Sequence, residues 1–119
     1  MARLFVYGTL KSGHCRDHML GGQRFVGTAV TADGYRLYDL GPYPGLVADA
    51  DAGGVRGELY EVSPGRLALI DVEEGVPEGL YRRGPVRLAG PSAWLAAETY
   101  FFLGDIRGFP DAGGVWPPP

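Results

Sequence analysis

Arg3-Leu4-Phe5-Val6-Tyr7-Gly8-Thr9-Leu10 is a short apolar and aromatic run that ends at a glycine. A run without polar alternation is typical of a strand buried on both faces, so residues 3–7 are predicted to form a central strand. Gly8 lets the backbone turn sharply, and the amides of Thr9 and Leu10 that follow are free to donate hydrogen bonds. We therefore predict that the 7–10 turn (Tyr7, Gly8, Thr9 and Leu10) forms one wall of a small-molecule pocket.

Outward from this run, the chain alternates β-prone segments with glycine- and proline-rich turns. The further predicted strands span residues 25–32, 35–40, 45–48, 55–62, 80–88 and 94–103. Asp33-Gly34 predicts an antiparallel hairpin of strands 25–32 and 35–40. Asp51-Ala52-Gly53-Gly54 predicts a second hairpin that joins strands 45–48 and 55–62. Residues 41–45 contain two prolines, which lack backbone donors, so they are expected to form a shaped loop.

One helix is predicted over residues 64–74. Ser63 can cap its first amides, Pro64 suits its first position, and Gly75 offers a stop. Residues 16–20 have a weaker helical or turn pattern. The tail from Gly104 is expected to be irregular, and its three terminal prolines are expected to fray.

Composition limits the classes of function. A chain of 119 residues is predicted to form a single domain, residues 1–119. Its net charge of -3 supplies no basic surface for phosphates or anionic lipids, so neither nucleic acid nor membrane is an expected partner. Cys15 is the only cysteine, and no export signal or membrane-length apolar run is visible, so a cytoplasmic location is expected.

Glu74 is the candidate proton-transfer residue of the predicted helix. It follows Ile70 by four residues and Leu67 by seven, which places it on their apolar stripe. Asp71, Glu73 and Glu74 also crowd a helix end whose dipole favours cations, and such conflicts are common at functional sites. If Glu74 is buried, desolvation raises its pKa and suits it to proton transfer near neutral pH. Glu73 is expected to be exposed; alternatively, all three carboxylates lie in solvent near a frayed helix end.

His14, Cys15, Asp17 and His18 are residue types that can bind metal ions. The two histidines would share a face of a helix, but the chain has no third histidine and Gly13 precedes the group. Neither a metal site nor a cofactor is predicted. Cys15 is not predicted to be a nucleophile, because its adjacency to His14 in sequence does not define their geometry.

Several tyrosines fall in predicted strands or loops, where the ring packs and the hydroxyl lies at the rim. They are Tyr43, Tyr60, Tyr81 and Tyr100. Tyr43, Tyr81 and Tyr100 are the candidates for lining the pocket.

Five motifs, in their order along the chain, resemble the gamma-glutamylcyclotransferase-like family. They are Phe5-Val6-Tyr7-Gly8-Thr9-Leu10, Tyr43-Pro44-Gly45, Gly57-Glu58-Leu59-Tyr60, Asp71-Val72-Glu73-Glu74-Gly75 and Tyr81-Arg82-Arg83. No single motif is specific, but together they span most of residues 3–103, and they are closest to the small bacterial and gamma-glutamylamine cyclotransferase branch. The resemblance implies an α+β fold, a small mixed β-barrel of about five or six strands with short flanking helices and a pocket at one end.

The resemblance also implies site residues and a reaction. In this family the substrate's glutamyl part is held by a Tyr-Gly-[Ser/Thr]-Leu turn, here Tyr7, Gly8, Thr9 and Leu10. A glutamate three residues after the helix aspartate acts as acid and base, which from Asp71 gives Glu74, although the adjacent Glu73 leaves a one-residue ambiguity. The substrate's α-amine attacks its own γ-amide carbonyl, giving 5-oxoproline and a free amine without metal or cofactor.

Two functions of different classes therefore stay open at the level of sequence. The first is an enzyme that cyclises a small gamma-glutamyl amide or amine. The second is a non-catalytic domain that binds small metabolites on the same scaffold, because one fold can host unrelated functions. The leaving group is undefined, since the loop 41–45 and the tail after Gly104 would recognise it, and the chain is expected to be a monomer or a homodimer.

Overall fold

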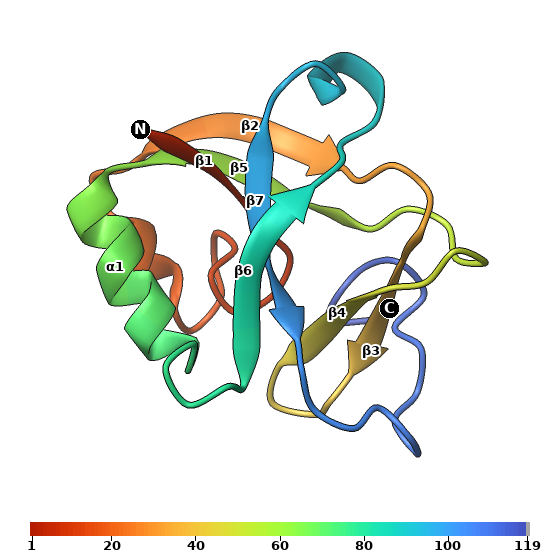
Figure 1. Ribbon diagram of the computed structural model, residues 1–119. Coiled ribbons are helices and arrows are strands. Elements are labelled where there is room, and N and C mark those ends of the chain that lie inside the picture. The colour runs from red at the N-terminus through yellow and green to blue at the C-terminus, as the bar shows by residue number, and fades with distance from the viewer. Residues whose placement is uncertain (119) are drawn as a thin grey trace.

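The computed structural model describes residues 1–118, which form seven strands, one α-helix and two short 3-10 helices (Figure 1). The elements are β1 (Ala2–Val6), η1 (Asp17–Leu20), β2 (Arg24–Val30), β3 (Tyr35–Asp39), β4 (Pro44–Ala48), β5 (Arg56–Val62), α1 (Pro64–Glu73), β6 (Tyr81–Val86), η2 (Gly90–Ser92) and β7 (Ala97–Phe102). The α+β class is therefore confirmed. No helix within these residues has the length and apolar character needed to span a bilayer.

The strands form one mixed sheet in which β1 is central. It pairs antiparallel with β5 and parallel with β7, while β2 extends the sheet beyond β5. β7 also pairs antiparallel with β6 along its whole length and parallel with β4, whose other neighbour is β3. β2 and β3 are the ends of this path, so the sheet is not closed, and only a single bridge between Thr31 and Leu88 joins the continuations of β2 and β6. The term barrel therefore describes the sheet only loosely.

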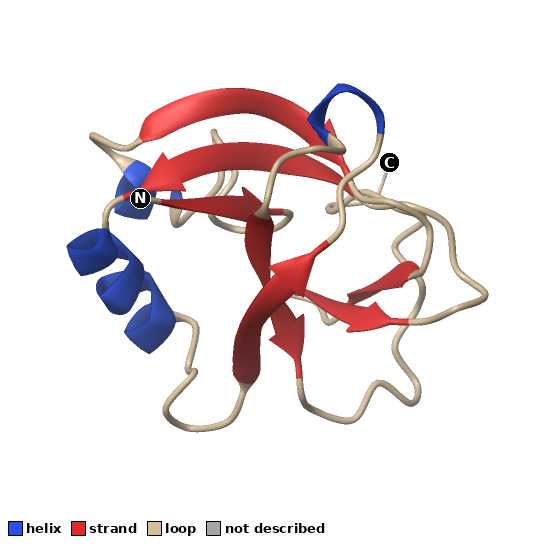
Figure 2. Ribbon diagram, turned by 45° about the horizontal axis from the view of Figure 1, so that its top comes forward, coloured by secondary structure: helices blue, strands red, loops and turns tan. Residues whose placement is uncertain are grey.

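Two hydrophobic clusters lie on the two faces of β1. Phe5 and Tyr7 belong to one cluster, whereas Leu4 and Val6 belong to the other, as the alternation of a strand requires. Leu4 and Phe5 are fully buried, which confirms the predicted central strand. The second cluster includes Leu67 and Ile70 of α1, so the helix covers this face of the sheet, away from the β3–β4 hairpin (Figures 1 and 2).

The helix α1 begins and ends close to the predicted residues. The Ser63 side chain accepts a hydrogen bond from the Arg66 amide at 3.3 Å, and Pro64 occupies the first turn. Glu74 is the C-cap, and Gly75 follows with φ of +74°, a conformation that favours glycine. The short helix η1 occupies most of the weaker 16–20 pattern and packs near α1.

Both predicted hairpins are wrong. β2 pairs with β5 and not with β3, and β4 pairs with β3 and β7 but not with β5. The amide of Gly34 donates to the carbonyl of Ala52 at 2.9 Å, so the Asp33-Gly34 turn joins β3 to the 49–54 loop. The turn residues specify a local bend, whereas the strand partners are selected by pairing over the whole length of β2.

The observed hairpin is β3–β4, and its second strand begins at Pro44, one residue before the predicted strand 45–48 and inside the predicted loop 41–45. Pro44 and Gly45 belong to β4, where Pro44 pairs with Asp39 and Gly45 with Tyr38. A proline is tolerated at the first residue of a strand, because the missing donor interrupts no central ladder position.

The tail after Phe102 is irregular, as predicted, but part of it is buried. Ala112 and Trp116 belong to the first hydrophobic cluster. The Trp116 indole donates a hydrogen bond to Asp39 Oδ1 at 3.1 Å. The backbone carbonyl of Trp116 accepts a hydrogen bond from Lys11 Nζ at 2.5 Å. The tail therefore anchors the residue that follows the 7–10 turn. The predicted fraying concerns three prolines, of which Pro119 lies outside the described residues.

Candidate active site

A small cavity lies between the end of β1, the start of β4 and the C-terminal end of α1. Its volume is about 20 Å³, about the space of one water molecule. It is lined by Phe5, Val6, Tyr7, Thr9, Leu10, Tyr43, Pro44, Glu74, Tyr81 and Tyr100. The structure thus brings together all the predicted site residues except Gly8.

Gly8 has a packing role in addition to the predicted one. A Cβ atom built on Gly8 would lie 2.8 Å from both Cγ and Cδ of Pro44, too close for a real contact. The position that a side chain of residue 8 would take is therefore occupied by the proline ring. The absence of a side chain lets the 7–10 turn contact the first residue of β4, which joins two of the five sequence motifs.

The 7–10 turn carries three buried backbone amides without an internal partner. Gly8, Thr9 and Leu10 are all buried, yet no group within residues 1–118 accepts a hydrogen bond from their amides. The carbonyls are used, because Gly8 accepts from the Lys11 amide at 3.0 Å and Thr9 accepts from the Arg16 amide at 2.8 Å. Buried amides without a partner are rare in proteins, so these donors are available to a ligand or to water.

Glu74 is the buried carboxylate of the cavity. Its side chain is 13% exposed, compared with 47% for Glu73. Burial raises the pKa of Glu74 to about 7; the nearby charge of Glu73 adds to this rise, and that of Arg16 opposes it. The predicted apolar stripe through Leu67 and Ile70 therefore ends in a carboxyl group that titrates near neutral pH, and the alternative of three solvated carboxylates is wrong.

Arg16 is a neighbour of the site that the sequence reasoning missed. Its Nη1 lies 3.6 Å from Oε2 of Glu74, and its Nε lies 3.4 Å from Oε1 of Glu73. These pairs form because η1 packs against the end of α1, and no local pattern around Arg16 signals that approach.

Three of the four tyrosine hydroxyls around the cavity are already engaged in hydrogen bonds. Tyr7 donates to the carbonyl of Tyr100 at 2.5 Å, and Tyr81 donates to the carbonyl of Pro44 at 2.6 Å. Tyr100 donates to Asp71 Oδ1 at 2.6 Å, and the Tyr43 ring packs 6.3 Å from that of Tyr81. Burial is the main cause that raises the pKa values of Tyr7, Tyr81 and Tyr100 above the ordinary tyrosine value. These side chains therefore stay neutral and form the walls of the cavity.

Asp71, the aspartate of the helix motif, connects α1 to the sheet. Its Oδ1 and Oδ2 accept from Nε and Nη2 of Arg83 at 2.9 and 3.1 Å, in addition to the bond from Tyr100. Arg83 also pairs with Glu98 at 2.7 Å. This network holds the last turn of the helix, and hence Glu74, against β6 and β7.

The residues considered for a metal site do not converge. Within residues 1–118, no group of three or more His, Cys, Asp or Glu side chains is placed to hold a metal ion. The His14 ring instead lies 5.8 Å from the Trp116 ring, and Cys15 is exposed.

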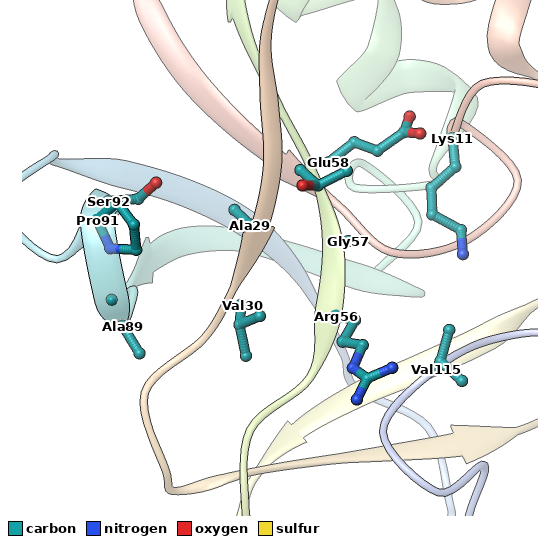
Figure 3. Close-up of a pocket in the computed structure, with 12 residues that line it drawn as sticks. Lys11, Ala29, Val30, Arg56, Gly57, Glu58, Ala89, Pro91, Ser92 and Val115 are labelled. Carbon is teal, nitrogen blue, oxygen red and sulfur yellow. The ribbon is translucent and has the colours of Figure 1, made fainter.

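A larger pocket of about 530 Å³ lies elsewhere, over β2 and β5 (Figure 3). It does not include Glu74 or any residue of the 7–10 turn, although Lys11 follows that turn directly. The larger volume does not make it the better catalytic candidate, because Glu74 and the 7–10 turn both line the smaller cavity.

The fold and the small cavity define a class of α+β domain in which a buried turn and a buried helix carboxyl meet at one site. The profile of the family described as "Gamma-glutamyl cyclotransferase, AIG2-like" matches residues 4–117. The chain belongs to this family.

Relatives and solved structures agree with this assignment. A Vibrio cholerae protein is 40% identical over 92 residues, which cover 77% of each chain. The "Gamma-glutamylcyclotransferase family protein YtfP" of Escherichia coli K12 is 34% identical over 93 residues, or 78% of this chain and 79% of that protein. The crystal structure of an AIG2-like protein from Mus musculus is similar with a TM-score of 0.79 and 28% identity, covering 93% of this chain and 85% of that one.

Proposed function

We propose that this protein cyclises a small gamma-glutamyl amide or amine to 5-oxoproline and releases an amine, with Glu74 as the general acid and base. The observation that carries the proposal is the position of Glu74 in one cavity with the turn whose amides are unpartnered. Membership of the cyclotransferase family supports the class of reaction. Burial raises the pKa of Glu74 to about 7, which suits this carboxyl group to proton exchange near neutral pH.

The reaction needs little beyond folding the substrate and moving protons. The substrate's α-ammonium gives one proton to the Glu74 carboxylate, and the resulting amine attacks the γ-carbonyl carbon. A new carbon–nitrogen bond closes the five-membered ring, and the original amide bond breaks. Glu74 returns this proton to the departing nitrogen. It then takes the second proton, which the ring nitrogen loses, and passes it to the released amine, which leaves as an ammonium ion. Because both reacting groups belong to one molecule, holding them in contact supplies much of the rate enhancement.

The 7–10 turn is the proposed binding element for the negatively charged oxygens of the substrate. Its three amides can hold the glutamyl carboxylate or the oxyanion that develops on the γ-carbonyl oxygen. A cavity of about 20 Å³ is smaller than a glutamyl group, so the side chains at its rim move when substrate enters. Arg16 does not line the cavity, but its guanidinium lies 3.6 Å from Glu74. A shift of this guanidinium from Glu74 to the substrate's α-carboxylate would open the site.

The proposal is tested by incubating the purified chain with a panel of gamma-glutamyl compounds. The panel contains gamma-glutamyl dipeptides, gamma-glutamyl-ε-lysine and gamma-glutamyl alkylamines, and two readouts are taken: 5-oxoproline by chromatography and the melting temperature of the protein. Ring product from any member supports the proposal. Thermal stabilisation without product would instead identify a metabolite-binding domain, and neither effect with any member would contradict both functions.

A further inference from the structure

The pocket over β2 and β5 has the size and walls of a ligand site. Its volume of about 530 Å³ lies within the range of small-molecule pockets, roughly 300–1,000 Å³. Its walls come from five separate parts of the chain: residue 11, residues 28–30, residues 56–58, residues 89–92 and residue 115. Figure 3 shows β2 and β5 side by side across the pocket, with Pro91 and Ser92 on one side and Lys11 and Val115 on the other.

Much of the lining is apolar. Val30 contributes a side chain that is 42% exposed, although valine is normally a buried residue. Ala29, Ala89, Pro91 and Val115 add further apolar surface. An apolar body placed here would remove this surface from water, which is favourable.

The charged residues of the pocket differ in how many hydrogen-bond or ion-pair partners they have. Glu58 accepts from the amide of Ser12 at 2.7 Å and from the hydroxyl of Tyr60 at 3.2 Å. By contrast, no acceptor or carboxylate within residues 1–118 pairs with the Arg56 guanidinium. Lys11 donates to one carbonyl and retains two N–H groups, and burial lowers its pKa, so a nearby anion would stabilise its charged form. Glu58 already interacts with the Lys11 charge, but the lining still holds two cationic side chains and one anionic side chain, which makes the pocket complementary to an anion.

We propose that this pocket binds a small organic carboxylate with an apolar body. The carboxylate lies between Lys11 and Arg56, whose side chains both extend toward the tail side of the pocket in Figure 3. The apolar body lies over Val30, Ala89 and Pro91. This site is separate from the proposed catalysis, because Glu74 does not line it.

Hexanoate is a suitable probe, because it combines one carboxylate with a short apolar chain. Its affinity for the full chain is measured by calorimetry, and hexan-1-ol and hexylammonium serve as neutral and cationic probes of the same length. Hexanoate is expected to bind most tightly of the three. Arg56→Gln is expected to weaken hexanoate about tenfold, the effect of losing one charge-assisted contact.

Matched variants separate this site from other modes of binding. Arg107→Gln removes an exposed arginine that does not line the pocket, and Glu74→Gln alters only the small cavity, so both are expected to keep the wild-type affinity. Val30→Trp fills the pocket from a half-exposed position and is expected to abolish binding without unfolding the protein, as thermal melting would verify. Equal affinity for hexanol and hexanoate, or unchanged affinity in Arg56→Gln, would contradict the proposal. Absence of hexanoate binding to the wild-type chain at millimolar concentration would also contradict it.

Discussion

Arg16 connects both halves of the candidate active site. Its guanidinium Nη1 lies 3.6 Å from Oε2 of Glu74, and its backbone amide donates to the carbonyl of Thr9 at 2.8 Å. The first contact opposes the effect of burial on the pKa of Glu74, whereas the second fixes the position of η1 relative to the 7–10 turn. A change of the Arg16 side chain therefore alters the charge balance at Glu74 and leaves the backbone link in place.

The Arg16→Gln variant tests this charge balance through the pH dependence of kcat/KM. In the wild type, activity is expected to rise with pH around a midpoint near 7, because Glu74 must be ionised to accept the first proton. Arg16 favours the ionised form, so its removal is expected to move this acid limb to higher pH. The midpoint is obtained from initial rates over pH 5–9.

Glu73→Gln is the matched variant that is expected to shift the Glu74 pKa in the opposite direction. The Glu73 carboxylate raises the pKa of Glu74, so the neutral variant is expected to move the same limb to lower pH and to retain substantial activity. Acid limbs that coincide in the wild type and both variants would show that Glu74 does not control the rate.

Glu74 is also expected to reduce the stability of the fold above acidic pH. Its pKa is about 7 in the folded protein and 4.5 as the ordinary value, so the folded state binds more protons between these limits and stability falls as pH rises. The cost reaches roughly 3 kcal/mol above pH 7. Glu74→Gln is therefore expected to match the wild type near pH 4.5 and to unfold at higher denaturant concentration near pH 8. A constant difference between the two proteins at all pH values would exclude a raised Glu74 pKa.

Gly8→Ala tests the contact between the turn and β4. The added methyl group would lie 2.8 Å from the Pro44 ring, so one of the two segments must move. The expected loss is about 1–3 kcal/mol of unfolding free energy, together with reduced activity, because the turn amides are displaced. Gly53→Ala is the control, since its Cβ would meet no atom within 4 Å. Equal stability of the two variants would refute the packing role of Gly8.

Tyr100→Phe separates the structural and chemical roles of the tyrosines. The Tyr100 hydroxyl donates to Asp71, which also accepts from Arg83, so its loss is expected to lower stability by about 1–2 kcal/mol. The ring that lines the cavity is retained. Activity per folded molecule is therefore expected to stay close to wild type, as measured by kcat well below the melting temperature. A large loss of kcat with unchanged stability would assign this hydroxyl to the chemistry.

Local signals predicted the parts of the fold that depend on neighbouring residues. The unbroken apolar run before Gly8 defines β1, and the Ser63-Pro64 pair defines the start of α1. The partners of the strands could not be predicted in this way. β2 pairs with β5, about thirty residues later in the chain, while the Asp33-Gly34 turn between β2 and β3 specifies only a bend.

The same distinction applies to the candidate site. Helical periodicity placed Glu74 on a buried stripe, because that relation needs only Leu67 and Ile70 on the same helix. Arg16 approaches Glu74 only when η1 packs against α1, so its role depends on tertiary structure. The pocket of Figure 3 depends on tertiary structure even more, because its walls come from five separate parts of the chain.

Proton transfer by the Glu74 carboxyl group during the cyclisation is tested most simply by 5-oxoproline formation in the wild type, Glu74→Gln and Glu73→Gln. Each is incubated at pH 7.5 with the best gamma-glutamyl substrate of the panel, after thermal melting has shown that it is folded. Ring product is expected from the wild type and from Glu73→Gln, with a rate lower by about 10²–10⁴ in Glu74→Gln. Wild-type turnover by a folded Glu74→Gln protein would show that Glu74 does not transfer these protons.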